Sequence, residues 1–398
     1  MVTATSPLAK ALGYRKFQGG APRLLVMKSS YFVVDDVIDG ARHLGWPVLE
    51  LEIALGEHGD TEFVKRLLMA VVQFKPDFVL TVNHIGFDKD GVLAGLLDRY
   101  GIPLASWFVD HPMMILGGSE GNAHATSQVF CFERTALPWL QTAGFEEPVY
   151  LPTASNARVF DPGRVEPAHA KRLGRPLSLV ANSWWQKARL SFTPEIRKEA
   201  RALASDQRVD RAYLQTHLQG VLREGGRESQ RKTVLAAQAA LAETSMQTRK
   251  AFAEALLPLG LVVYGDKHWS DLVTGLDPLP PVDFRRDLPA LFAGSRVNTN
   301  VTAEQMPTAL NQRVWDVPAV GGFLLTDAQP DVFEYFEEGR DVVTFTSLDE
   351  AKDKARFYLA NAAAREEIVK RAKATVETHH RTHHRLEAIE AVMRKRFG

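Results

Sequence analysis

Cysteine is almost absent from this chain. Cys131 is the only cysteine among 398 residues, which excludes an internal disulfide framework and a metal site built from several thiolates. It lies in the apolar run QVFCF. We therefore expect a buried structural thiol rather than a nucleophile.

Net charge and long apolar runs are also lacking. The 48 basic and 48 acidic residues give a formal net charge of zero, which argues against a general affinity for nucleic acid or an anionic membrane. No uninterrupted apolar run approaches the roughly 18 residues of a membrane span, and the N-terminus lacks the apolar segment of a signal peptide. We expect a cytoplasmic protein with no membrane span and no nucleic-acid partner.

Short apolar segments alternate with segments of helical periodicity. The length of 398 residues fits two domains of roughly 150–200 residues each. The alternation predicts an α/β fold with parallel sheets covered by helices on both faces. In the first half, the predicted strands are residues 23–27, 48–53, 78–82, 104–109, 129–132 and 149–151.

Proline and glycine punctuate the chain near residues 153–176, which predicts a domain boundary. We expect one doubly wound domain at 1–160, a second at 175–375, and a final helix at 376–398 that can pack back on the first. The mostly helical insertion at 193–257 is interpreted as having solvated charged faces; a dimerisation arm and an acceptor-specificity element both stay open. Ligands in such sheets bind at the carboxyl ends of strands, so a cleft between the domains is the default site.

The segment RVWDVPAVGGFLLTD, residues 313–327, is the most informative part of the chain. It predicts a helix, a glycine turn and a buried strand, an arrangement that borders nucleotide pockets in many α/β proteins. Arg313 could meet a diphosphate, and Asp316, one turn further on the same face, could meet a ribose. The alternative is an ordinary helix-to-strand connection with a surface acid.

Candidates for proton transfer follow two strands of the first domain. Asp110 and His111 come directly after residues 104–109, and His84 follows residues 78–82. A carboxylate beside a histidine could deprotonate or orient an acceptor hydroxyl. The alternatives are that Asp110 caps the next helix and that His111 is a surface residue.

Two patterns have the spacing of metal ligands, but we expect no metal at either. Asp88-Lys89-Asp90 is an Asp-x-Asp match with a lysine between the acids, and a cap for the following helix explains it better. The late histidines have the i, i+4 spacing of a zinc helix but lack its glutamate after the first histidine. They are His379, His380, His383 and His384.

The second half resembles the CgeB-like glycosyltransferase family, and the first half resembles the DUF3880-type domain often fused to it. The residues that carry this resemblance are Tyr264-Gly265-Asp266 with Trp269, residues 295–302, 313–327 and 333–346, His383-His384-Arg385, Asn83-His84 and residues 107–112. The resemblance implies the GT-B fold, in which two Rossmann-like domains face a central cleft, here with a helical insertion in the second. It implies transfer of a sugar from a nucleotide-diphospho-sugar, with a UDP-sugar as the expected co-substrate and no further cofactor.

The resemblance also assigns a donor grip to residues 313–322. Asp316 takes the position of the family's ribose-binding glutamate, Arg313 is its arginine three residues earlier, and Gly321 and Gly322 let the backbone approach the donor. An earlier glutamate of retaining relatives is replaced by Thr308.

A second phosphate grip is implied after the first strand of the second domain. The family's Gly-Arg pair falls on Ala181-Asn182, its lysine is kept as Lys187, and Arg189 could compensate for the missing arginine. Asp266 is a further candidate, for the base. Two cations on a diphosphate would neutralise the charge that develops on the leaving group without a metal.

The sequence does not identify the acceptor. A small molecule, a glycan, or a protein such as flagellin or another surface component are all compatible. A nucleotide-sugar epimerase would change the donor with no acceptor present. The absent Gly-Arg pair and Thr308 favour a third alternative, a noncatalytic nucleotide, sugar or partner binder on a decayed scaffold.

Overall fold

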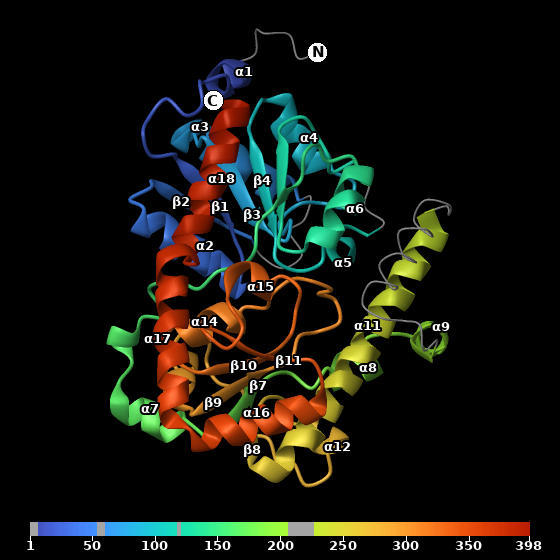
Figure 1. Ribbon diagram of the computed structural model, residues 1–398. Helices are drawn as coiled ribbons and strands as arrows, with labels where there is room; N and C mark the ends of the chain where they lie inside the picture. Colours follow the sequence, from blue (N-terminus) through green and yellow to red (C-terminus); the bar gives the residue numbers. More distant parts are fainter. Residues whose placement is uncertain (1–6, 54–59, 118–120, 206–226) are drawn as a thin grey trace. The chain divides into compact units, whose positions relative to one another are not determined.

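The computed structural model describes residues 7–53, 60–117, 121–205 and 227–398. The chain divides into two compact units (Figure 1). The first comprises Met1–Thr153 together with Thr382–Gly398, and the second comprises Ala154–Arg381. The sequence predicts a first domain at 1–160 and a final helix at 376–398 that can pack back on it; in the structure the first unit ends at Thr153 and includes the chain from Thr382.

The first unit contains a six-stranded parallel sheet in the order β2-β1-β3-β4-β5-β6. Its strands are β1 (Leu24–Lys28), β2 (Val48–Glu52), β3 (Phe78–Val82), β4 (Leu104–Phe108), β5 (Ser127–Cys131) and β6 (Val149–Tyr150). Successive strand residues point to opposite faces of a sheet. Leu24 and Val26 accordingly pack with one set of helices, and Leu25 and Met27 pack with another.

Helices cover both faces of this sheet. One face packs against α2 (Phe32–His43) and the C-terminal α18 (Thr382–Phe397). The other packs against α3 (Thr61–Phe74) and α4 (Val92–Arg99). The remaining helices of this unit are α1 (Pro7–Leu12), α5 (Pro112–Leu116) and α6 (Leu137–Thr142).

The second unit contains a five-stranded parallel sheet in the order β11-β10-β9-β7-β8. Its strands are β7 (Leu177–Val180), β8 (Leu261–Tyr264), β9 (Val297–Asn300), β10 (Leu324–Asp327) and β11 (Val343–Phe345). The prediction of two α/β units with parallel sheets is therefore confirmed.

Helices also cover both faces of the second sheet. Those with core residues on one face are α11 (Arg227–Leu256) and α16 (Leu348–Ala360), and α17 (Ala362–His379) contributes Ile368 to this core and Val376 to the other. Those on the other are α13 (Leu288–Gly294), α14 (Arg313–Ala319) and α15 (Val332–Tyr335). The unit also has α7 (Pro167–Leu173), α8 (Trp185–Leu190), α9 (Pro194–Ser205) and α12 (Trp269–Leu272).

Of the predicted helical insertion at 193–257, residues 206–226 lie outside the described residues, and the described part differs from the prediction of solvated faces. Helix α11 is not exposed to solvent along its whole length. Its residues Phe252, Ala253 and Leu256 belong to the hydrophobic core that packs on the second sheet. Small side chains nearer the start of the helix are buried as well, among them Ala236, Ala240 and Ala242. The alanine-rich composition therefore reflects close packing on several sides, which a count of charges along the helix does not indicate.

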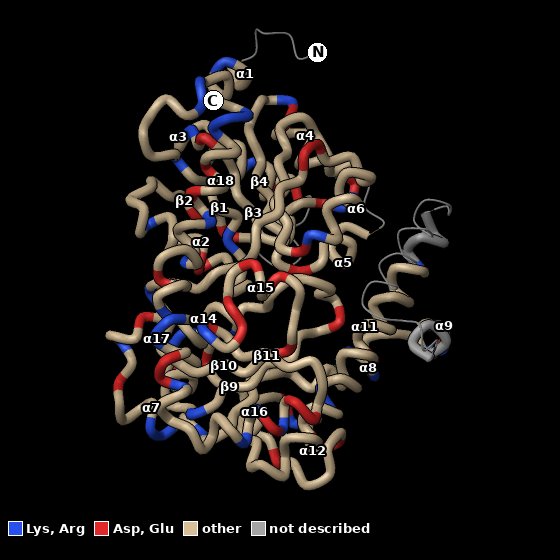
Figure 2. Tube along the Cα trace, viewed as in Figure 1, with Lys and Arg blue, Asp and Glu red and all other residues tan. Residues whose placement is uncertain are grey.

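Basic and acidic residues are interspersed in both units over the part of the chain that the structure describes (Figure 2). None of the described helices is both long and apolar enough to cross a bilayer.

Candidate functional site

Arg313 lies at the carboxyl edge of the second sheet. It is the first residue of α14, and its Nε donates a hydrogen bond of 2.7 Å to Oδ1 of Asn300, the last residue of β9. Asn300 is fully buried and is itself held by a bond from its Nδ2 to Thr326 Oγ1 at 2.8 Å. Asn311 Nδ2 donates to the same Asn300 oxygen at 2.9 Å. Two strands and a loop therefore fix the position of the guanidinium.

The charge of Arg313 is not neutralised by an ion pair. Among the described residues, no carboxylate forms a salt bridge with it. Burial lowers the pKa of Arg313 to about 10, although the charges of Asp327 and Asp316 act in the opposite direction. A half-buried cation whose hydrogen-bond acceptor is a neutral amide favours an anionic ligand.

Asp316 is buried. It is therefore not the surface acid that an ordinary helix-to-strand connection would carry, and it is not accessible to a ligand. Only 1% of its surface is exposed, and Gln312 Nε2 lies 3.4 Å from its Oδ1. A ribose cannot reach a carboxylate that is enclosed to this degree. The predicted ribose contact is therefore not supported, and Asp316 acts in this structure as a buried negative charge near Arg313.

Asp266 holds together the loops that follow β7 and β8. Its two carboxylate oxygens accept bonds from the backbone N and the Oγ of Ser183, at 2.6 and 2.7 Å, and from the N of His268 at 3.1 Å. The ring of His268 stacks on Trp185, with 4.1 Å between centroids. Asp266 therefore positions the loop of the second phosphate grip, and its oxygens are engaged there rather than offered to a base.

The two predicted cations of α8 have different surroundings. Lys187 is exposed, and its Nζ lies 5.1 Å from the ring centroid of Trp184. Arg189 forms a salt bridge of 2.9 Å with Glu243 of α11. Arg189 thus joins two helices and does not compensate for the missing arginine, whereas Lys187 remains available to a ligand.

Gly321 and Gly322 do not lie at the ligand edge. They precede β10, at the amino end of the sheet, because α14 runs from the carboxyl edge to the opposite one. A Cβ on Gly322 would lie 2.7 Å from the carbonyl oxygen of Phe292, and Gly321 has a φ of +78°. The prediction that these glycines admit the donor backbone is wrong, since tight packing and the turn itself require them.

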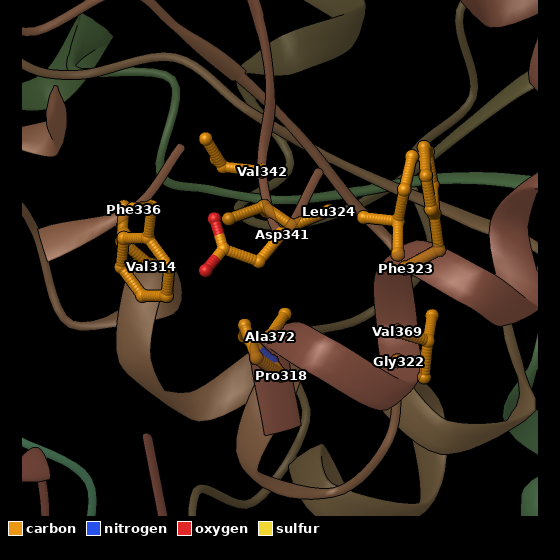
Figure 3. Close-up of a pocket in the computed structure, with 11 residues that line it drawn as sticks. Val314, Pro318, Gly322, Phe323, Leu324, Phe336, Asp341, Val342, Val369 and Ala372 are labelled. Atoms are coloured by element: carbon orange, nitrogen blue, oxygen red, sulfur yellow. The ribbon is translucent and has the colours of Figure 1, made fainter. Parts of the chain in front are cut away.

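A small cavity next to Gly322 supports this correction (Figure 3). Its volume is about 10 Å³, about enough for one water molecule and far too small for a nucleotide. Val314, Pro318 and Ala372 line it together with the single acid Asp341. It is a gap in helix packing rather than a ligand pocket.

In the first unit, Asp110 lies at the carboxyl edge of β4 within a hydrogen-bonded cluster. Its Oδ2 accepts bonds from Asn83 Nδ2 at 2.8 Å and from the Tyr31 hydroxyl at 3.0 Å. Asn83 Oδ1 in turn accepts from the backbone N of Val109 and of Asp110. Burial and the Asp110 charge raise the pKa of Tyr31, so the phenol stays protonated and donates to the carboxylate.

Asn83 and His84 have an unusual backbone. Their φ angles are +52° and +55°, a left-handed conformation that non-glycine residues rarely adopt. Two such residues in succession at the end of β3 cost free energy, and strain of this kind gathers at functional sites. Here it brings the Asn83 amide to Asp110.

His84 is a buried structural residue. Only 5% of its surface is exposed, and both ring nitrogens are engaged, Nδ1 with Ser106 Oγ at 3.0 Å and Nε2 with Asn122 Oδ1 at 3.1 Å. No nitrogen is left for a substrate. The prediction of His84 as a proton acceptor is therefore not supported.

His111 is buried as well and is not the surface residue of the alternative. It has 4% of its surface exposed, and its Nε2 has no hydrogen-bond partner among the described residues. Burial lowers its pKa to about 4, although Glu133 and Asp110 act in the opposite direction. The unpartnered nitrogen is itself enclosed, so the contact of His111 with an acceptor stays a prediction.

Acid should destabilise the first unit through His84. Burial lowers its pKa to about 4 from an ordinary value of 6.5, so the folded state binds the proton less readily than the unfolded state. The stabilisation is present above pH 6.5 and is lost as the pH falls toward 4. Between pH 7 and pH 5, His84 should account for a loss of about 2 kcal/mol in the free energy of unfolding.

Urea unfolding at pH 7 and pH 5 measures this difference. His84→Asn removes the titrating group and tolerates the left-handed backbone. The variant should be less stable than the unaltered protein at pH 7 and should lose less stability on acidification. An equal loss in both proteins would contradict the assignment.

The metal-like patterns are explained by other contacts. Asp88 caps α4, accepting bonds from the backbone N of Val92 at 2.9 Å and of Leu93 at 2.8 Å, which confirms that interpretation. His380 packs on Trp315 in the second unit, whereas His383 stacks on His43 in the first. Within the described ranges, no group of three or more potential ligands could hold a metal ion.

Sequence reasoning missed Arg249 of α11. Its Nη1 donates a 2.6 Å bond to the carbonyl of Asn182, in the loop after β7. Asn182 therefore contributes its backbone there, while its side chain is exposed. The sequence holds no signal for this contact, because 67 residues separate the pair and the helix around Arg249 contains many other charges.

Comparison with known proteins finds one family model that matches part of the chain. Residues 247–391 match a family model described as glycosyl transferase-like. The matched segment includes Arg249, β8 to β11 and Arg313. No curated protein matches the chain.

Solved glycosyltransferases of the GT-B class share the fold. A glycosyltransferase from Rickettsia africae ESF-5 has a TM-score of 0.53 and 11% identity over 95% of this chain and 99% of its own. T4 phage BGT, solved with its UDP-glucose substrate, has a TM-score of 0.51 and 10% identity over 94% and 99%. Anabaena Alr3699/HepE, solved with UDP, has a TM-score of 0.50 and 11% identity over 94% and 100%. At this identity the likeness establishes the fold alone.

Proposed function

We propose that this protein transfers a sugar from a nucleotide-diphospho-sugar to an acceptor hydroxyl. The observation that carries the proposal is the Arg313 guanidinium, held by Asn300 at the carboxyl edge of a parallel sheet without an ion-pair partner in the described chain. The glycosyl transferase-like match of residues 247–391 supports a sugar donor. UDP or UDP-glucose in two proteins of similar fold favours a UDP-sugar.

We assign the donor to the second unit and the acceptor to the first. Arg313 and Lys187 would hold the diphosphate, with charge that is already in place when negative charge develops on the leaving UDP. Asp110 would accept the proton of the acceptor hydroxyl. Its cluster with Asn83 and Tyr31 fixes the carboxylate.

The finer assignments are part of the same proposal. They are a CgeB-like and DUF3880-type relationship, a cytoplasmic location, and an acceptor that is a small molecule, a glycan or a protein of the cell surface. The loss of the Gly-Arg pair at Ala181-Asn182 favours one rival, a noncatalytic nucleotide binder.

Transfer should not require a metal, since Arg313 and Lys187 would supply the positive charge that a metal would otherwise bring to the diphosphate. Release of UDP from UDP-glucose, to water or to an added acceptor, should continue at an unchanged rate in EDTA. Loss of release in EDTA with recovery in Mg²⁺ or Mn²⁺ would contradict metal independence. Nucleotide binding without any turnover would support the noncatalytic alternative, and change of the sugar without UDP release would indicate an epimerase.

A further inference from the structure

Helix α11 takes part in building the ligand edge of the second sheet. Ser245 Oγ accepts a bond of 3.0 Å from the backbone N of Glu304, in the segment after β9. Thr248 Oγ1 donates a bond of 2.9 Å to the carboxylate of the same glutamate. One face of the helix is therefore fixed to the loop after β9, and the next residue, Arg249, reaches the loop after β7.

Arg249 is a buried cation that forms no ion pair with any residue that the structure describes. Only 6% of its surface is exposed. Its Nη1 bond to the Asn182 carbonyl is to a neutral oxygen, and its Nε is buried without a hydrogen-bond partner in the described ranges. Buried arginines are normally paired, because removing a charge from water without compensation is costly.

The surroundings of Arg249 increase this cost. Burial lowers the pKa of Arg249 to about 9, and the positive charge of Arg313 acts in the same direction. The nearby carboxylates of Asp266 and Asp327 act in the opposite direction. They are engaged elsewhere, Asp266 with Ser183 and Asp327 with the N and Oγ1 of Thr302 at 3.0 and 2.8 Å.

Anchoring the loop after β7 does not by itself account for an arginine here. One bond to a backbone carbonyl needs a single neutral donor, whereas a guanidinium brings a full charge and five donors. Arg249 follows Thr248, which bonds to the loop after β9, and it bonds to the loop after β7, while Arg313 bonds to the last residue of β9, the strand that pairs with β7. An anion that accepts from both guanidinium groups would stabilise them together. Trp184 adds a common surface, since its ring centroid lies 5.1 Å from Lys187 Nζ and 5.6 Å from the Arg249 guanidinium carbon.

We infer that Arg249 and Arg313 together form a diphosphate-binding site, with Lys187 at its exposed side. The inference rests on the proposed function. It adds Arg249 of α11, which the sequence analysis does not assign to donor binding. It also accounts for the asparagine at position 182. The guanidinium that is absent from that position is supplied by α11, which bonds to the carbonyl of the same residue.

Binding of UDP and UMP by the full chain without metal tests the site, because the two nucleotides differ by one phosphate. Arg249→Met should weaken UDP binding about 10- to 100-fold and UMP binding much less, so that the UDP-to-UMP affinity ratio falls. Arg249→Lys keeps the charge but loses the planar donor pair, and it should recover part of the ratio. Lys250→Met is the matched control, since the neighbouring side chain is 38% exposed and lies on the helix surface near Glu254.

The outcomes separate this inference from the proposed function. Equal weakening of UDP and UMP in the Arg249 variants would mean that the residue only supports the loop, and unchanged affinities would mean that it has no role. Either result overturns the inference while the function stands. No UDP binding by the unaltered protein would remove the UDP-sugar function and the inference together. Circular dichroism and the melting temperature identify a variant that has lost its fold, and in that case the Arg249→Lys ratio decides.

Discussion

Replacing Arg313 with methionine is expected to lower kcat/KM for UDP release from UDP-glucose by about 10²–10³-fold, which corresponds to about 3–4 kcal/mol. The guanidinium bonds to Asn300 and forms no salt bridge in the described chain, so its charge is available to a diphosphate. In a partly dry site such a charge stabilises the leaving group far more than it would in water. Steady-state kinetics would measure the effect on turnover, and titration with UDP would measure the effect on nucleotide affinity.

The matched control for this variant is Arg340→Met in the same unit. Arg340 is exposed and forms a salt bridge with Glu337 on the surface, an interaction worth little. It should leave turnover and UDP affinity unchanged. If Arg313→Met folds normally and binds every nucleotide as tightly as the unaltered protein, the assignment of the donor edge is wrong.

Asp110→Asn is expected to lower turnover by about 10²–10⁴-fold while UDP affinity stays the same. The amide oxygen can still accept the bonds from Asn83 and Tyr31, so the cluster is preserved and only the basicity is lost. Because Asp110 belongs to the first unit, the change should not affect donor binding in the second. Rate measurements with saturating UDP-glucose test the expected loss of turnover, and a thermal shift with UDP tests whether UDP affinity is unchanged.

Asp90→Asn provides the control, since Asp90 is an exposed acid of the same unit. It should leave the rate unchanged, and it also removes half of the Asp-x-Asp match. A loss of turnover in Asp90→Asn with none in Asp110→Asn would reverse the assignment and reopen a metal-dependent mechanism.

The sequence predicts the fold well because strand burial is recorded locally. The run FVLTV lies in β3 and is buried throughout, and LASWF lies in β4 with the same burial. The sequence predicts that the final helix can pack back on the first domain, and α18 does belong to the first unit, but the sequence does not show which residues it contacts. Its contacts, such as those of Leu386 with α2 beside Gly40, join residues more than 300 positions apart.

The candidate site was predicted less completely, for two physical reasons. A motif gives the residue type but not the direction of the side chain, so Asp316 and His84 proved to be enclosed. The assignment of Gly322 failed for another reason, because a turn that precedes a strand lies at the amino end of that strand, whereas ligands bind at the carboxyl ends. Arg249 was missed because the ligand edge gathers side chains from distant elements.

The most direct test of the proposed function is a thermal-shift comparison of UDP, GDP, dTDP, CDP and ADP, without metal. A ligand at about 100 times its dissociation constant adds about 2.7 kcal/mol to the free energy of unfolding. UDP should give a clear upward shift in melting temperature, and the shift should be lost in Arg313→Met. No shift with any of the five nucleotides would contradict the proposal that this chain binds a nucleotide-diphospho-sugar.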